Sequence, residues 1–227
     1  DITAVKTLKT LEQENRSATD AEKEILSKYV GWGGIPQAFD KNNESWSTEY
    51  SQLKELLTHQ EYRQANASVL DAFYTSPVVI DGIYEALENF GFQGGNVLEP
   101  AMGVGNFFGR MPEEMQKNSR LYGVEIDSIS GRIAQKLYPD ADIAIQGFEK
   151  NNFQNGCFDV AVGNVPFGEL SFKDDKHGTT KLHDYFFSET LDKVKDGGIV
   201  AFVTSAGTLD KRDESTRKAL AEKADFI

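Results

Sequence analysis

The sequence has little of what several classes of protein need. It contains one cysteine, Cys157, in 227 residues, which excludes an internal disulfide and a cysteine-rich metal site. It has no run of about 18 apolar residues, and its N-terminus lacks the charged-then-apolar pattern of a signal peptide. Neither a membrane span nor export is therefore expected, and the predicted location is cytoplasmic.

Basic residues and histidines are also scarce. Lys and Arg number 24 against 36 Asp and Glu, which gives a formal net charge of −12. Surfaces that bind nucleic acid need clustered Lys and Arg, so the composition argues against a broad DNA-binding face on this chain. The 3 histidines have too few potential ligands around them for a metal site, and no metal is expected.

What remains is enough for one sizeable hydrophobic core. Hydrophobic residues make up 39% of the chain, which allows one main domain with a smaller helical appendage. The chain begins at Asp1 without an initiator Met and ends at Phe226-Ile227, apolar residues typical of an opening strand. We therefore expect it to be a fragment of a longer protein.

Residues 1–72 predict a small helical subdomain. Apolar residues recur at helical spacing over Thr3–Asn15 and Ser47–Leu57. Thr19–Glu22 and Thr58–Glu61 have the T-x-x-E form in which side chains at both ends satisfy free backbone N–H groups at a helix start. Between them, three glycines surround Trp32, for which we favour burial between helices over contact with a partner.

Residues 73–227 predict an α/β domain. Pro77 suits the first position of a helix that Ser76 can cap, and further helices are expected at Ser128–Leu137, His183–Lys195 and Asp213–Ala224. Five short apolar runs alternate with helices, as in parallel sheets with right-handed crossovers. These strand candidates are Asn96–Leu98, Leu121–Val124, Ile143–Ile145, Phe158–Val162 and Ile199–Val203.

Ligands of open α/β sheets lie at the carboxyl ends of the strands, and the first strand ends in Glu99. A loop with Gly103 and Gly105 follows. The missing Cβ atoms allow backbone to approach a ligand, and the next helix offers free N–H groups. Glycines at this spacing occur in many turns, and Glu99 could simply cap one.

The second strand ends in another carboxylate, Glu125, which could accept hydrogen bonds from two ribose hydroxyls. A phosphate-binding loop would have glycine where Phe108 stands, and Glu99 would repel a pyrophosphate. A carboxylate there suits an amino group or a sulfonium instead. The pattern therefore favours S-adenosylmethionine over a dinucleotide.

The fourth predicted strand leads into a turn, Gly163-Asn-Val-Pro-Phe-Gly168. The Asn164 side-chain oxygen and the Val165 carbonyl could both accept hydrogen bonds from one exocyclic amine, while Phe167 stacks on a planar ring. Such acceptors would orient the nitrogen lone pair and stabilise the positive charge that develops on it. The alternative is a rigid turn without a chemical role.

Four motifs occur in an order that resembles the N6-adenine DNA methyltransferases of the gamma arrangement. They are Thr75-x-Pro77, Glu99-Pro-Ala-Met-Gly-Val-Gly105, Gly-Val-Glu125-Ile-Asp and Asn164-Val-Pro-Phe167. Together with Tyr-Val-Gly-Trp-Gly-Gly in the helical part, they are similar to the methylase portion of large methylase-helicase proteins of phages and mobile elements, including antirestriction-like ones. The resemblance covers nearly the whole chain. It implies a Rossmann-like class I methyltransferase sheet with S-adenosylmethionine as cofactor.

The resemblance also implies roles for individual residues. The catalytic turn would be Asn164, Val165, Pro166 and Phe167, with the flipped base stacked on Phe167. The cofactor would be bound by Thr75, Glu99, Pro100, Ala101, Met102, Gly103, Gly105, Glu125, Ile126 and Phe148. DNA would be the substrate, bound partly by helicase and target-recognition regions of the parent protein outside this chain.

The chain departs from the family pattern in three places. Val165 replaces the first proline of N-P-P-F, and Phe148 stands where the family's third motif has an acidic residue, which leaves Glu149 as a shifted candidate. The sheet is expected to lack its last strands because the chain stops at Ile227. Two alternatives stay open: a non-catalytic antirestriction or DNA-binding module, and a protein-glutamine or RNA methyltransferase. We also expect Ser171–Thr180 to be a mobile loop that could close over substrate.

Overall fold

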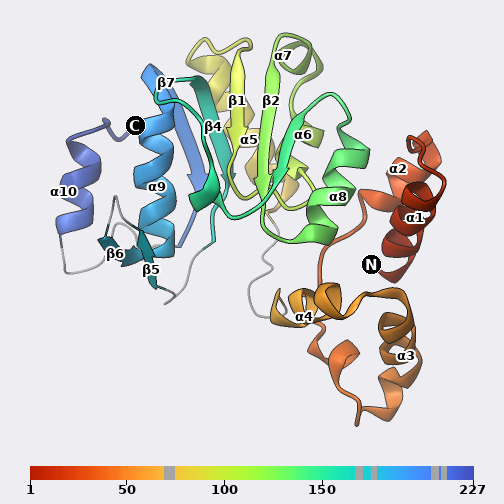
Figure 1. Cartoon of the computed structure of the whole chain (residues 1–227). Coiled ribbons are helices and arrows are strands. Elements are labelled where there is room, and N and C mark those ends of the chain that lie inside the picture. The colour runs from red at the N-terminus through yellow and green to blue at the C-terminus, as the bar shows by residue number, and fades with distance from the viewer. Residues whose placement is uncertain (69–74, 167–170, 175–177, 206–209, 211–213) are drawn as a thin grey trace.

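The computed structural model describes residues 1–227 except 69–74, 167–170, 175–177, 206–209 and 211–213. Five of its strands form one parallel sheet in the order β3-β2-β1-β4-β7 (Figure 1). Their bounds are β1 Asn96–Glu99, β2 Arg120–Glu125, β3 Asp142–Ile145, β4 Phe158–Asn164 and β7 Val194–Val203. The five predicted strands and the predicted parallel sheet are therefore confirmed.

Helices cover both faces of this sheet. They are α5 Pro77–Asn89, α6 Asn106–Arg110, α7 Glu113–Lys117, α8 Ser128–Leu137 and α9 Leu182–Lys193, with a 3-10 turn η4 at Phe148–Lys150. A further helix, α10 Ser215–Ala221, packs against α9. Val97 packs into a buried cluster with residues of α5, α6 and α8. Its neighbour Leu98 packs into another cluster with Tyr185 and Phe186 of α9. Successive side chains of a strand point to opposite faces, so both faces are buried, as predicted for a parallel sheet.

Some predicted boundaries are wrong. α9 ends at Lys193 and not at the predicted Lys195, because the chain enters β7 at Val194. Pro77 is the first residue of α5 as predicted, but the Ser76 side chain makes no capping hydrogen bond. α10 begins at Ser215, later than the predicted Asp213, which lies outside the described residues.

The segment expected to be a mobile loop is largely a ribbon. β5, Ser171–Asp174, pairs antiparallel with β6, Gly178–Lys181. The stretch is polar, as loops are, but it also contains Thr179-Thr180, and β-branched residues favour extended backbone. The residues between the two strands lie outside the described part of the chain.

The N-terminal part is helical, as predicted. It consists of α1 Ile2–Gln13, α2 Asp20–Leu26, α3 Ser47–Leu56 and α4 His59–Ala67, with 3-10 turns η1 Pro36–Phe39 and η2 Glu44–Trp46. Both predicted capping boxes are present. Thr19 caps α2 together with Glu22, and Thr58 caps α4 together with Glu61.

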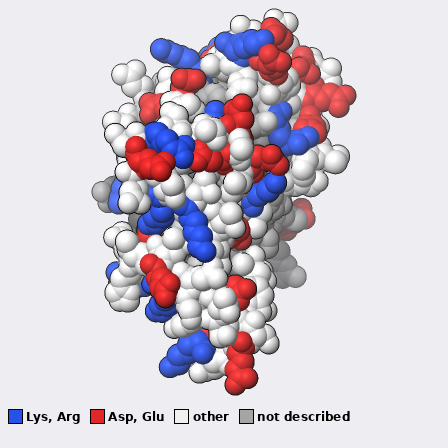
Figure 2. All heavy atoms as spheres, turned by 90° about the vertical axis from the view of Figure 1, so that its right-hand side faces the viewer, with Lys and Arg blue, Asp and Glu red and all other residues white. Residues whose placement is uncertain are grey.

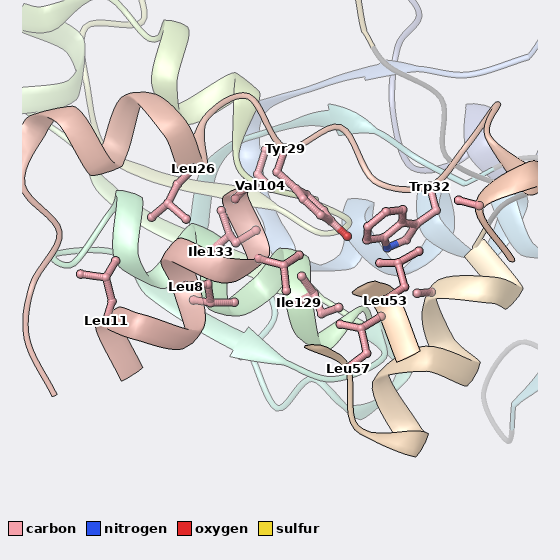
Figure 3. Close-up of a cluster of buried hydrophobic side chains, with 14 residues drawn as sticks. Leu8, Leu11, Leu26, Tyr29, Trp32, Leu53, Leu57, Val104, Ile129 and Ile133 are labelled. Atoms are coloured by element: carbon pink, nitrogen blue, oxygen red, sulfur yellow. The ribbon is translucent and has the colours of Figure 1, made fainter. Parts of the chain in front are cut away.

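The N-terminal helices share one buried core, the N-terminal cluster (Figure 3). Trp32 is 2% exposed in its centre and makes edge contacts with the rings of Tyr29 and Phe39. The prediction that this tryptophan is buried between helices is therefore confirmed. The buried members of the cluster are Ala4, Val5, Leu8, Leu11, Leu26, Tyr29, Trp32, Ala38, Leu53, Leu57, Ala65, Val104, Ile129 and Ile133.

The N-terminal cluster extends into the α/β part. Val104 comes from the loop after β1, and Ile129 and Ile133 come from α8 (Figure 3). Arg132 of α8 forms ion pairs with Glu12 of α1 and Glu61 of α4. The predicted boundary at residue 72 lies outside the described residues and stays a prediction, but the two parts share one core.

On the side that α1 to α3 form, acidic and basic side chains alternate (Figure 2). Several are paired with each other, for example Arg16 with Glu22 and Lys28 with Glu24. Among the described residues, no helix is long and apolar enough to cross a membrane. The same residues contain no cluster of side chains that could hold a metal ion.

Candidate cofactor and active site

A cavity of about 560 Å³ lies at the carboxyl ends of β1, β2, β3 and β4. Its volume falls within the range of about 300–1,000 Å³ that is usual for small-molecule sites. Most of the predicted site residues line it, from four different strand ends. They are Thr75, Glu99, Pro100, Ala101, Met102, Gly103, Glu125, Ile126, Phe148, Asn164, Val165 and Pro166.

Glu99 ends β1 and is buried, with 2% of its surface exposed. Its Oε2 atom has no hydrogen-bond partner among the described residues. The backbone of β4 lies against it, since a Cβ on Gly163 would be 3.6 Å from Glu99 Cγ. Burial first, and then the charge of Glu125, raise the pKa of Glu99 well above its usual range. A buried carboxyl group in this state is ready to accept a hydrogen bond from a cationic ligand.

The glycine loop after Glu99 is held by hydrogen bonds. The Met102 N–H donates to the Val124 carbonyl of β2 at 3.1 Å, and the Gly105 N–H donates to the Met102 carbonyl at 2.8 Å. Gly103 lines the cavity with φ +56°, and the position that a Cβ would take there is open. A side chain at this residue would therefore be strained and would extend into free space around the loop.

Gly105 is not among the residues that line the cavity. It adopts φ +84°, and a Cβ there would lie 2.5 Å from the ring of Tyr138. The Tyr138 hydroxyl also donates to the Gly105 carbonyl at 2.7 Å. Glycine is thus needed here for close packing at the start of α6. Sequence reasoning missed Tyr138, which follows α8 and carries no motif of its own.

Glu125 ends β2, and its carboxylate holds the glycine loop that follows the neighbouring strand, β1. Its Oε2 accepts the Gly103 N–H at 2.6 Å, and its Oε1 accepts the Asp127 N–H at 2.7 Å. Burial raises its pKa to about 7, and the charge of Asp127 adds to the rise, although the hydrogen bonds from these backbone N–H groups lower it. A carboxylate oxygen can accept more than one hydrogen bond, so Glu125 can still bind hydroxyl groups of a ligand.

Two apolar side chains that the sequence singled out, Ile126 and Phe148, also line the cavity. Ile126 is 68% exposed although it is a large aliphatic residue, and it lines the cavity. Phe148 of η4 is buried and stacks on Phe186 of α9, with ring centroids 5.3 Å apart and an angle of 19° between the rings. Glu149, the shifted acidic candidate, also lines the cavity. Ile126, Phe148 and Glu149 thus add two apolar side chains and one carboxylate to the lining of the cavity.

The Asn164 turn lies at the end of β4, across the cavity. The Val165 N–H donates to the Val203 carbonyl of β7 at 3.2 Å, a hydrogen bond that proline could not form. The Val165 side chain is 1% exposed and packs in a buried cluster with Leu98. In this chain, sheet pairing and packing therefore hold the backbone that a proline ring would otherwise restrain. Phe167 lies outside the described residues.

The charge of the lining residues limits the ligand. None of the described residues that line the cavity is Lys, Arg or His. Four are acidic: Glu99, Glu125, Asp127 and Glu149. Phosphate and pyrophosphate sites offer cationic side chains or backbone N–H groups without such an excess of carboxylates. The cavity therefore suits a ligand with positive charge. Its carboxylates fit S-adenosylmethionine, which carries an ammonium and a sulfonium group.

Sequence reasoning missed part of the wall. Tyr29, Val30 and Gly31, at the end of α2, line the cavity together with Gln64 and Ser68 from α4 and its end. The signal in the sequence is the glycine-rich turn around Trp32, which by itself does not indicate a position in the site. Periodicity shows that a turn exists and not which distant strand end it faces.

Comparison with known proteins places this geometry in context. No model of a protein family matches the chain. Defense against restriction protein B of Escherichia phage P1 is 28% identical over 221 residues, which cover 94% of this chain and 8% of that protein. The modification methylase CviBIII of Paramecium bursaria Chlorella virus NC1A is 27% identical over 138 residues, 58% of this chain and 36% of that protein. The chain thus spans a small part of the curated relatives it matches.

The fold has solved counterparts as well. A Listeria monocytogenes structure, assigned to the class I S-adenosylmethionine-dependent methyltransferases, superposes with a TM-score of 0.53 at 14% identity. The match covers 97% of this chain and 77% of that one. The chain has the class I methyltransferase fold. The predicted fold class is confirmed, and the methyltransferase fold agrees with the prediction of S-adenosylmethionine as the cofactor. The predicted resemblance to phage antirestriction proteins and DNA methylases is confirmed by the two relatives.

Proposed function

We propose that the chain is an S-adenosylmethionine-dependent methyltransferase domain that methylates the N6 amino group of adenine in DNA. The observation that carries this proposal is the convergence of Glu99, Glu125 and Asn164 on one cavity. DNA is favoured as the substrate because one relative is named a modification methylase and another a protein for defence against restriction.

The cofactor would lie along the ends of β1 and β2. The buried Glu99 Oε2 has no hydrogen-bond partner within the described part of the chain and would accept from the amino group of the methionine part, near Thr75 and the loop around Gly103. Glu125 would accept from the ribose hydroxyls, with Ile126 and Phe148 beside the adenine. When bound, S-adenosylmethionine supplies the methyl group.

The Asn164 turn would hold the base that receives the methyl group. The Asn164 side-chain oxygen and the Val165 carbonyl would accept both hydrogens of the amine, which orients its lone pair and stabilises the positive charge that develops on nitrogen. Phe167 would stack on the ring. A base within a duplex cannot reach this turn, so it would have to be flipped out, at a cost of a few kcal/mol.

Cofactor binding is the first test. Calorimetry on the purified chain should show one bound S-adenosylmethionine, and Glu99→Gln should weaken binding by about tenfold or more, because hydrogen bonds to charged groups contribute about 1.5–3 kcal/mol. NAD should not bind. Absence of S-adenosylmethionine binding to the wild-type chain would reject the proposed function.

Methyl transfer is the second test. The full-length parent protein, incubated with labelled S-adenosylmethionine, should label DNA at N6 of adenine, in preference to RNA or protein. Asn164→Ala should abolish the transfer, whereas Asn118→Ala, an exposed residue at the end of α7, should leave it intact. Normal methylation by the Asn164 variant would refute the role of the turn. Labelled RNA or protein would instead assign the enzyme to another substrate.

A second candidate is a binding module that protects DNA from restriction without methylating it. The match to the phage defence protein favours this alternative, because the match covers 94% of this chain. Val165, which stands where the family has proline, favours it as well. Protection of DNA by the wild-type parent protein, with no methylated adenine, and equal protection by its Asn164→Ala variant would establish this alternative. In either case, helicase and target-recognition regions of the parent protein are the proposed partners.

A further inference from the structure

The N-terminal helices supply one wall of the cavity. Val30 and Gly31 line it from the turn after α2, and Gln64 lines it from α4. Val30 is 48% exposed although it is apolar, and its N–H donates to Asp1 Oδ1 at 2.8 Å. α4 lies beside the edge of the sheet at which β1 and β2 end (Figure 1). Val30 and Gly31 belong to the Tyr-Val-Gly-Trp-Gly-Gly motif, to which the sequence assigned no role in the site, and Gln64 belongs to no motif.

This wall is anchored to the glycine loop. Val104 stands between Gly103 and Gly105, and its side chain is 5% exposed within the N-terminal cluster, to which Tyr29 also belongs (Figure 3). The same cluster contains Ile129 and Ile133 of α8. The N-terminal helices and the loop that lines the cavity therefore rest on one shared core and keep a fixed relative position.

The contacts of the wall place it at the Glu125 end of the cavity. The Ser128 hydroxyl, at the start of α8, donates to Gln64 Oε1 at 3.2 Å. Tyr29 lies beside Ser130 and close enough to Asp127 for that charge to raise its pKa, after burial. Ser128 and Ser130 both belong to the first turn of α8, the helix that follows Glu125 in the chain. Asn164, at the end of β4, comes from a strand separated from β2 by β1.

We propose that Val30, Gly31 and Gln64 form the wall that recognises the adenosine half of the cofactor. Val30 packs against the nucleoside, and the Gln64 amide, held by Ser128, donates a hydrogen bond to it. This assignment rests on the proposed function, in which Glu125 and Ile126 bind the same half. The methionine half lies at Glu99, away from the N-terminal wall.

Comparison of two ligands shows which half of the cofactor a residue binds. S-adenosylhomocysteine contains both halves, whereas 5′-methylthioadenosine lacks the amino-acid group. Gln64→Ala should weaken both by about three- to tenfold, the range expected for one neutral hydrogen bond. Val30→Ala should weaken both by a smaller factor. Glu99→Gln should weaken S-adenosylhomocysteine strongly and leave 5′-methylthioadenosine nearly unchanged.

Gln60→Ala is the matched control, because Gln60 lies on the same helix, is exposed and does not line the cavity. It should bind both ligands like the wild type. Thermal unfolding without ligand should be alike for Gln60→Ala and Gln64→Ala, which shows that the fold is intact. Affinities are measured by competition with labelled S-adenosylmethionine on the purified chain.

The outcomes are distinct. If Gln64→Ala and Val30→Ala bind both ligands like Gln60→Ala, the adenosine wall is refuted while the proposed function stands. If they weaken S-adenosylhomocysteine but not 5′-methylthioadenosine, the wall contacts the amino-acid half and the assignment is also refuted. If the wild type binds neither ligand nor S-adenosylmethionine, the proposed function itself fails.

Discussion

At the scale of single residues, the site depends on carboxyl groups that are buried before any ligand arrives. Glu99 has an oxygen without a partner among the described residues, and its pKa is raised by burial and by the charge of Glu125. Such an arrangement costs free energy in the empty protein. A cationic ligand would recover part of that cost, which gives the proposed cofactor a measurable proton linkage.

We expect binding of S-adenosylmethionine to release a proton from Glu99. Burial and the charge of Glu125 raise the pKa of this carboxyl group in the absence of ligand, and an adjacent ammonium group favours the ionised form and lowers that pKa. Affinity should therefore rise as pH increases through the pKa of the empty site. Calorimetry in two buffers of different ionisation enthalpy measures the protons released. Glu99→Gln should lower that number, and an unchanged number would contradict the assignment.

The raised pKa of Glu125 predicts how the stability of the ligand-free protein depends on pH. This pKa is about 7 in the folded chain, above the value of 4.5 that an unburied glutamate has. The folded state then binds more protons than the unfolded state between these values, so the contribution of Glu125 is present below pH 4.5 and is lost as pH rises through about 7.

Urea unfolding of the empty protein across this pH range measures the effect. The free energy of unfolding of Glu125→Gln should fall less steeply with pH than that of the wild type. Parallel curves would show that Glu125 does not carry a raised pKa. Glu61 acts in the opposite direction. Burial opposes its ionisation, but hydrogen bonds from Lys9, the Thr58 N–H and Arg132 lower its pKa to about 2, so its contribution is lost only as pH falls below 4.5.

Val165 illustrates how one residue can replace another by a different physical route. A proline at this position would restrict φ by its ring. Here the Val165 N–H instead pairs with Val203 of β7 and the side chain fills the core. The carbonyl that the proposed mechanism uses is thus restrained by the sheet.

At the scale of elements, α8 joins the two parts of the chain. Its Arg132 pairs with Glu12 of α1 and Glu61 of α4, while Lys136 donates to the Arg16 carbonyl at 2.9 Å. Its apolar side enters the N-terminal cluster through Ile129 and Ile133. The helix that follows Glu125 therefore also contacts the residues of the proposed adenosine wall.

Replacing Arg132 should destabilise the protein markedly. Arg132→Ala leaves the buried Glu61, which is 6% exposed, with fewer charged partners, at an expected cost of about 2 kcal/mol. Lys28→Ala is the control, because the pair it forms with Glu24 is 69% and 72% exposed and should contribute about 0.5 kcal/mol or less. Denaturant unfolding compares the two variants. Equal small losses would mean that the ion pairs of α8 do not join the two parts.

At the scale of the whole molecule, the shared core predicts cooperative unfolding. The 2 tryptophans, Trp32 and Trp46, both lie in the N-terminal part. Because Val104 and α8 belong to the N-terminal cluster, separating the two parts would expose apolar surface on both. Tryptophan fluorescence and far-UV circular dichroism should therefore give the same denaturation midpoint. A fluorescence transition at lower denaturant would show an independently unfolding N-terminal part.

Sequence patterns alone determined the elements and much of the candidate site. Alternation of apolar runs with helical stretches identified the five parallel strands of the sheet. Inspection of the strand ends then identified Glu99, Glu125 and Asn164 as candidate site residues. This worked because burial on both faces and ligand binding at strand ends leave local signatures. The T-x-x-E capping boxes at Thr19 and Thr58 were equally local, and both were confirmed.

Only the tertiary structure decided how distant segments meet. Nothing in the spacing of residues 29–31 or of Gln64 indicates that they face the end of β2, or that Val104 belongs to the core of the N-terminal helices. A periodic pattern records that a side chain is buried but not which side chains cover it. The burial that raises the pKa of Glu99 likewise depends on β4 lying against β1. The sequence therefore named the chemical groups, and packing between segments far apart in the chain set their environment and completed the cavity around them.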